Sequence, residues 1–140
     1  MLRHQAVALG AAALVAAAGC GGGGPVGRTA LEGQSQSLQS GAAEGALLAR
    51  GGASGRTTRT FRRVHASELA QAASEVASAL RDSEAEHGLE ETRHRLVSVA
   101  VEIHADLKRL GDASGDEQRA LAADLDAAAL ESRRIGASLR

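Results

Sequence analysis

The sequence contains no tryptophan, tyrosine or asparagine, and it has one residue each of phenylalanine, proline and cysteine: Phe61, Pro25 and Cys20. The lack of aromatic rings removes the stacking platforms that single-stranded nucleic acids require. A lone cysteine excludes an intramolecular disulfide, and the absence of asparagine excludes N-linked glycosylation. Alanine supplies much of the 44% hydrophobic content. The core must therefore be small.

An excess of one charge is also missing. Sixteen basic and seventeen acidic side chains give a formal net charge of −1. Proteins that bind nucleic acid usually carry a strongly basic surface, so the charge balance adds to the argument against a nucleic-acid partner. One local exception is the stretch from Arg50 to Arg63, which holds five arginines and no acids. Attraction to an anionic surface and a solvated basic helix start are both compatible with it, and we favour the second.

The N-terminal residues follow the pattern of an export signal. Arg3 precedes an apolar run from Ala6 to Ala18 that is interrupted only by Gly10, and small residues follow. As a helix, this run of about 13 residues covers roughly 20 Å, which is less than the roughly 30 Å hydrocarbon core of a bilayer. The pattern predicts a signal peptide over residues 1–19 rather than a permanent transmembrane span.

The end of this segment, Ala17-Ala18-Gly19-Cys20, resembles the lipobox of bacterial lipoproteins. The resemblance implies signal cleavage between Gly19 and Cys20 and attachment of a diacylglycerol to the sulfur of Cys20. It also implies a location on the extracytoplasmic face of the cell membrane, because two or more acyl chains hold a protein on a bilayer. The alternatives are an ordinary secretory signal with an incidental cysteine and an apolar N-terminal helix that is not cleaved.

Residues 20–56 are rich in Gly, Ser, Gln and Ala and poor in large apolar side chains. Such a composition is typical of a segment that buries too little surface to fold. We therefore expect a flexible tether, which as a random chain of about 36 residues would span roughly 30–36 Å.

Residues 57–140 are predicted to form the folded part, because apolar residues recur there at spacings of three and four. Three amphipathic stripes follow from this spacing. They comprise Phe61, His65, Leu69, Ala72, Val76 and Leu80; then Leu89, Leu96, Ala100, Ile103, Leu107 and Leu110; and finally Leu121, Leu125, Ala128, Ile135 and Leu139. The narrow stripes predict an all-α fold, either a small antiparallel three-helix bundle or a coiled-coil-like domain.

Local signals place the ends of these helices. Gly88 and Gly111 suit the left-handed position that follows a helix, and Ser114 with Glu117 has the form of a capping box. Residues 97–104, VSVAVEIH, alternate as in a strand. We nevertheless predict a helix there, because no second strand is present to pair with it.

Catalytic and metal-binding patterns are weak. His65, His87, His94 and His104 remain after the signal peptide, and Glu91 with His94 has the E-x-x-H spacing of di-iron bundles. Such a site needs two of these elements, and the chain has one. No nucleophile has a base placed beside it by the sequence, so we predict no catalytic residues, no metal ligands and no cofactor.

We therefore predict a lipid-anchored envelope protein that is not an enzyme. The helical domain would act as an interaction or structural module, either with another envelope protein or by self-association. The alternative is a carrier of a small ligand or metal that uses the bundle or its histidines. These two functions predict different behaviour, namely association through a helix face or a ligand-dependent gain in stability.

Overall fold

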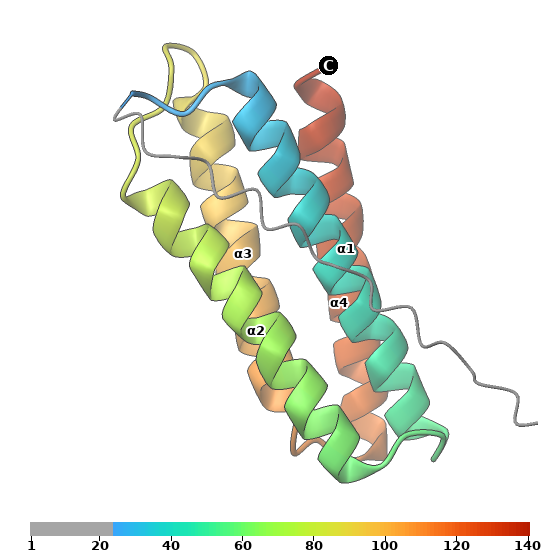
Figure 1. The fold of residues 1–140 in the computed structure, drawn as a ribbon. Coiled ribbons are helices and arrows are strands. Elements are labelled where there is room, and N and C mark those ends of the chain that lie inside the picture. Colours follow the sequence, from blue (N-terminus) through green and yellow to red (C-terminus); the bar gives the residue numbers. More distant parts are fainter. Residues whose placement is uncertain (1–23) are drawn as a thin grey trace, which may run out of the picture.

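The computed structural model describes residues 24–140, which form four helices. Helix α1 comprises Arg28–Ala53, α2 Arg59–Arg81, α3 Glu90–Leu110 and α4 Gly115–Ser138. The prediction of an all-α fold is confirmed over the described residues, whose single β feature is an isolated bridge between Val26 and Ala85. The bundle has four helices rather than the predicted three (Figure 1).

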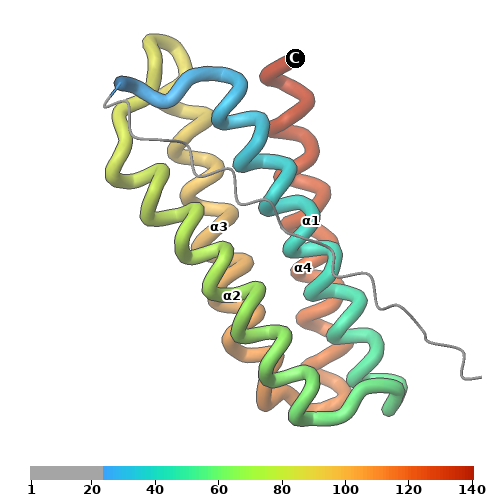
Figure 2. Tube along the Cα trace, viewed as in Figure 1, coloured from blue at the N-terminus to red at the C-terminus, as the bar shows by residue number. Residues whose placement is uncertain are grey.

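The helices pack as two pairs, α1 with α4 and α2 with α3. At one end of the bundle, Nη1 of Arg28 in α1 donates to the carbonyl of Leu139 just after α4, at 2.9 Å. At the other end, Nε of Arg62 in α2 donates to the carbonyl of Leu110 in α3, at 3.2 Å. Helix α3 also contacts α1 and α4, whereas α2 and α4 share no contact. Figure 2 shows the chain passing along α1, back along α2, out again along α3 and back along α4.

The predicted flexible tether over residues 20–56 is wrong from Arg28 to Ala53, because these residues form α1. The helix buries a set of residues spaced alternately four and three apart: Leu31, Ser35, Leu38, Ala42, Gly45 and Ala49. This is the spacing of a coiled-coil seam. Several of these positions hold polar or small residues. The composition of the segment therefore does not reveal its helical spacing. The predicted domain boundary at residue 56 accordingly lies between two packed helices.

Small residues let α1 approach its neighbours closely. A Cβ built on Gly45 would lie 2.6 Å from Cδ2 of Leu107 in α3 and 3.2 Å from Cδ1 of Leu125 in α4. On the α4 side, the hydroxyl of Ser35 donates to the carbonyl of Ser132 at 2.6 Å. Gly136 leaves the space that the Ser35 hydroxyl occupies. The α1–α4 seam therefore depends on glycine and serine as much as on leucine.

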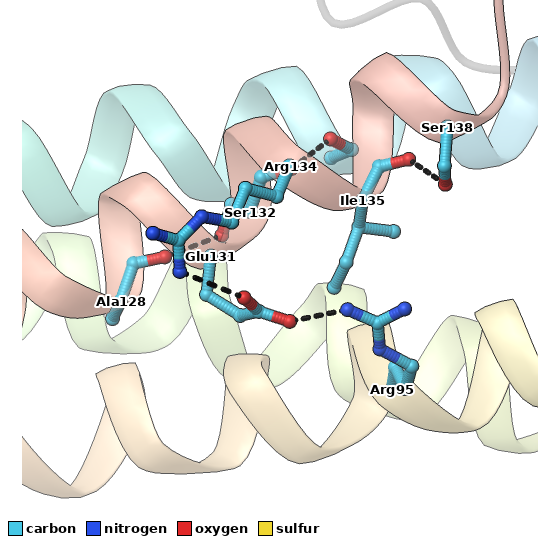
Figure 3. Close-up of polar contacts among 8 residues, drawn as sticks. Arg95, Ala128, Glu131, Ser132, Arg134, Ile135 and Ser138 are labelled. Carbon is cyan, nitrogen blue, oxygen red and sulfur yellow. Dashed lines mark hydrogen bonds and ion pairs between the residues drawn. The ribbon is translucent and has the colours of Figure 1, made fainter.

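Polar contacts are made by both the partly exposed and the buried positions of α4. Glu131 lies between Arg95 of α3 and Arg134 of its own helix (Figure 3). The buried hydroxyl of Ser132 donates to the carbonyl of Ala128, one turn earlier, at 2.9 Å. These contacts satisfy polar groups at the edge of the core and join α3 to α4.

The predicted stripes of α3 and α4 are confirmed, because every residue named in them is buried. The residues of the strand-like stretch 97–104 are helical, as predicted. The predicted stripe of α2 is only partly correct. Leu80 is buried as predicted, and Leu69 and Val76 are partly buried against the core, but Phe61 is 51% exposed. The other buried positions of α2 are ones that the stripe did not include: Arg62, Ala66, Ala70, Ala73 and Ala77. Alanines on the inner face allow α2 to pack close to α3, and the larger side chains are displaced toward the rim.

The predicted helix ends are partly correct. Gly88 has a φ of +84°, as expected, although α2 already ends at Arg81. Gly111 is right-handed, with a φ of −54°, so the left-handed end predicted there is wrong. Ser114 is the N-cap of α4, but its side chain makes no capping hydrogen bond. The carboxylate of Glu117 accepts a hydrogen bond from Arg109 at 3.3 Å, so it is engaged elsewhere.

Candidate functional site

The predicted lipid-attachment residue, Cys20, lies outside the described residues, as do Gly19 and the whole predicted signal peptide over residues 1–19. What the structure describes is the point at which the chain enters the bundle. The amide of Val26 donates to the carbonyl of Glu84 at 2.7 Å, and the amide of Glu86 donates to the carbonyl of Val26 at 3.1 Å. These two bonds attach the entering chain to the α2–α3 loop.

A side chain from the same loop reinforces this attachment. The carboxylate of Glu86 lies against Gly27, where a Cβ would be 2.7 Å from its Oε1. Gly27 is the N-cap of α1, and no side chain caps this helix end by a hydrogen bond. A negative charge at this position interacts favourably with the positive end of the helix dipole. The chain therefore enters the bundle at a fixed place, beside the α2–α3 loop.

The arginines of the basic stretch lie at the opposite end, where most of them have partners. Arg50 pairs with Asp126 at 2.6 Å, while Arg59 and Arg63 lie 2.9 and 3.6 Å from Asp112. The hydrogen bond from Arg59, with the charge of Arg63, lowers the pKa of the Asp112 carboxyl. Paired arginines have less charge to offer an anionic surface, which favours the interpretation of a solvated basic helix start.

The histidines are dispersed over the bundle. Nδ1 of His65 lies 3.0 Å from Oε2 of Glu68, and its Nε2 lies 3.6 Å from Oε1 of Glu44 in α1. The ring of Phe61 lies tilted against that of His65, with the ring centroids 4.9 Å apart. Nδ1 of His104 is 2.9 Å from the carbonyl of Ala70. His65 thus bridges α1 and α2 on a half-exposed rim.

The E-x-x-H element of α3 makes a different contact from the predicted pattern. Nε2 of His94 accepts from Nη2 of Arg93 at 2.7 Å. His87 is fully exposed and lies 3.8 Å from Glu90. Among residues 24–140, no three side chains of His, Cys, Asp or Glu lie close enough together to hold a metal ion.

One carboxyl group has its pKa shifted upward. The side chain of Asp106 in α3 is 18% exposed. Burial raises its pKa, and the neighbouring carboxylate of Asp124 in α4 adds to the effect. The sequence analysis did not identify this pair, because Asp106 and Asp124 are brought together only by the packing of α3 on α4.

A groove beside the α2–α3 loop was also missed. It has a volume of about 520 Å³, and its lining includes the guanidinium groups of Arg81 and Arg93 beside the imidazole of His94. Arg81 ends α2 and Arg93 lies in the first turns of α3, so the turn through Gly88 brings them together. Both arginines lie at similar distances along the chain from this turn. A turn between two antiparallel helices places such residues close together, and sequence analysis could have used this signal.

No helix within the part of the chain that the structure describes is long and apolar enough to cross a membrane. Comparison with protein-family models gives no match. Comparisons with curated proteins and with solved structures give none either.

Proposed function

We propose that this chain is a lipid-anchored protein of the bacterial cell envelope, held by Cys20 on the extracytoplasmic face of the cytoplasmic membrane. Its helical bundle is a non-enzymatic module for interaction or structural support. The observation that carries the anchor is Ala17-Ala18-Gly19-Cys20 at the end of a short apolar run that follows Arg3. Two or more acyl chains on Cys20 would provide stable membrane attachment.

The place where the chain enters the bundle gives the proposal an orientation. Val26 is attached to the α2–α3 loop, and six residue steps separate it from Cys20. Six residues span at most about 20 Å when fully extended. The α2–α3 end of the bundle would then lie close to the membrane surface, and the arginine-rich end would lie away from it, about 39 Å along the 26 residues of α1.

Exposed apolar side chains support a role in interaction. Five large ones are exposed in the described residues: Leu47, Phe61, Val64, Val101 and Leu130. Of these, Phe61 and Val64 lie within one turn at the start of α2, which contacts α3 and α1 but not α4. Apolar groups that remain in water favour association with a partner surface.

The anchor is tested by intact mass and membrane partitioning of the protein from its native host, beside the Cys20→Ala variant. The expected mass begins at Cys20 and includes acyl chains, and the variant loses both these chains and membrane retention. Ser40→Ala, an exposed change in α1, is a control that should leave both unchanged. An unacylated mass, or retention of Cys20→Ala in the membrane, would refute the anchor.

Association is tested by sedimentation velocity over a concentration series. Self-association through the start of α2 predicts that Val64→Glu shifts the protein to monomer, because a buried charge opposes contact. Ala123→Glu adds the same charge on the exposed side of α4 and should have no such effect. A wild-type protein that is monomeric at every concentration would exclude self-association as the role of the module.

A further inference from the structure

The groove between the end of α2 and the first half of α3 combines two kinds of lining. Arg81, Arg93 and His94 form one end, and Val97 and Val101 extend along α3 from it. Eight residues separate Arg93 from Val101, which corresponds to about 12 Å along the helix. The groove therefore has a cationic end and an apolar end.

The two guanidinium groups have no carboxylate partners within ion-pair distance among the described residues. Nη1 of Arg93 donates to the carbonyl of Leu80 at 2.7 Å, and Nη2 donates to His94. Its buried Nε–H has no acceptor. Because all of these partners are uncharged acceptors, the positive charge of Arg93 remains available to an anion.

Acidic groups lie at the margins of this site. Glu90 lies one turn before Arg93. Hydrogen bonding to backbone is the main cause of its lowered pKa, and the charge of Arg93 makes a small further contribution. Glu102 lines the groove at the end distant from Arg93. A ligand with a single negative end would therefore meet attraction at Arg81 and Arg93, whereas a second negative end would be repelled at Glu102.

The apolar end gives the site a second requirement. Val101 is 40% exposed, although it belongs to a helix that is otherwise well packed, and Val97 is half-buried against the core. An alkyl chain laid over these valines would remove apolar surface from water on both partners. A small inorganic anion would contact only the arginines and would leave this surface in solvent.

We propose that the groove binds an amphiphilic anion, with its phosphate or carboxylate head against Arg81 and Arg93 and its alkyl chain over Val97 and Val101. The head would complete the hydrogen bonding of two guanidinium groups, which bind phosphate and carboxylate well because of their planar, fork-shaped donors. This site goes beyond the proposed anchor and interaction module, and it does not depend on acylation of Cys20.

The test is calorimetric titration of the full chain carrying Cys20→Ala with octyl phosphate below its micelle concentration. Inorganic phosphate and the neutral octyl glucoside are the comparison probes. Octyl phosphate should bind more tightly than either, because only it has both a charged head and a chain. Arg81→Gln should weaken its binding by about tenfold or more, as expected for one lost hydrogen bond to a charged group.

Arg133→Gln is the matched control, since Arg133 is exposed on α4, away from the groove. This variant should bind octyl phosphate like the parent chain, and circular dichroism should show that both variants are folded. Equal losses in Arg81→Gln and Arg133→Gln would overturn the site, because they would indicate unspecific charge attraction. If octyl phosphate bound no more tightly than inorganic phosphate, or no more tightly than octyl glucoside, the proposal of an amphiphilic anion as the ligand would be refuted.

Vesicles distinguish the two sources of such a ligand. Binding to phosphatidylglycerol vesicles that exceeds binding to phosphatidylcholine vesicles, and that falls in Arg81→Gln but not in Arg133→Gln, would identify a bilayer lipid as the ligand. Octyl phosphate binding without this vesicle pattern would also support the proposal and would identify a free amphiphile. Absence of octyl phosphate binding to the folded parent chain would refute it.

Discussion

Helix α1 buries leucine, serine and glycine as well as alanine, whereas α2 buries mainly alanine against α3 and leaves Phe61 half exposed. In neither helix does side-chain size identify the buried face. Close approach of two backbones needs small residues at the contact, and the larger residues then fill the space beside it. The comparison teaches that glycine and alanine positions define the packing of this bundle, and leucines on α3 and α4 fill its centre.

The two pairs also differ in what joins them to the rest of the molecule. Helices α1 and α3 each contact the three other helices, whereas α2 and α4 do not contact each other. Leu107 of α3 lies where α1 and α3 meet, directly opposite Gly45. The centre of the fold therefore lies where α1 and α3 meet. Helix α2 is peripheral to it, because its inner face is mainly alanine and adds little side-chain volume to the core.

The largest effect is expected from Leu107→Ala. Leu107 is fully buried, and its removal leaves a cavity opposite Gly45, so the free energy of unfolding should fall by about 2–5 kcal/mol. Phe61→Ala removes a larger side chain from the peripheral helix and should cost less than about 1.5 kcal/mol, since Phe61 is 51% exposed. Urea titration followed by circular dichroism measures both. A greater loss in Phe61→Ala would contradict the assignment of α2 as peripheral.

Smaller changes in the free energy of unfolding, of opposite sign, are expected from two glycine substitutions in α1. Gly45→Ala places a Cβ 2.6 Å from the buried Leu107, and overpacking of about 1–3 kcal/mol outweighs the roughly 1 kcal/mol that alanine gains in a helix. Gly33→Ala has nothing within 4 Å and should stabilise the protein by about 0.5–1 kcal/mol. The same urea titration decides the point. Stabilisation by both substitutions would show that α1 is not packed closely against α3.

The difference between the two regions explains what the sequence could reveal. Leu96, Leu107, Leu121 and Ile135 are large, apolar and buried, so the periodicity in α3 and α4 predicted both the helices and their inner faces. In α1 the same four-and-three spacing is present, but Ser35 and Gly45 occupy two of its positions. A serine that donates to a backbone carbonyl across the seam belongs to the core, and composition alone does not reveal this.

The functional sites also differ in whether a local sequence pattern reveals them. The motif that ends at Cys20 is local in sequence, and sequence alone was sufficient to propose it. Arg81 and Arg93 form one groove only because the α2–α3 turn brings them together. The same holds for Asp106 and Asp124, whose proximity requires α3 and α4 to pack side by side. Contacts between helices of unknown register are not encoded in any short pattern.

The smallest expected effect is on the pH dependence of stability, in which two carboxyl groups of the bundle differ. The pKa of Asp112 is lowered, chiefly by the hydrogen bond from Arg59, so its carboxylate contributes stability above the unfolded-state pKa of about 4. This contribution is lost as the pH falls through the lower folded-state pKa. The pKa of Asp106 is raised, chiefly by burial, so its contribution is present below about pH 4 and is lost as the pH rises through the higher folded-state pKa.

Asp112→Asn and Asp106→Asn should therefore have opposite pH dependence. The difference in Tm between wild type and Asp112→Asn should grow as the pH rises from about 3 to 6, because only the wild type gains the ionised pair with Arg59. For Asp106→Asn, the stability of the wild type relative to the variant should fall over the same range, since ionisation of a partly buried carboxyl, beside Asp124, destabilises the folded state. Thermal unfolding across this pH series measures both. Parallel curves for the two variants would show that the half-buried Asp106 and the exposed Asp112 do not have pKa values shifted in opposite directions.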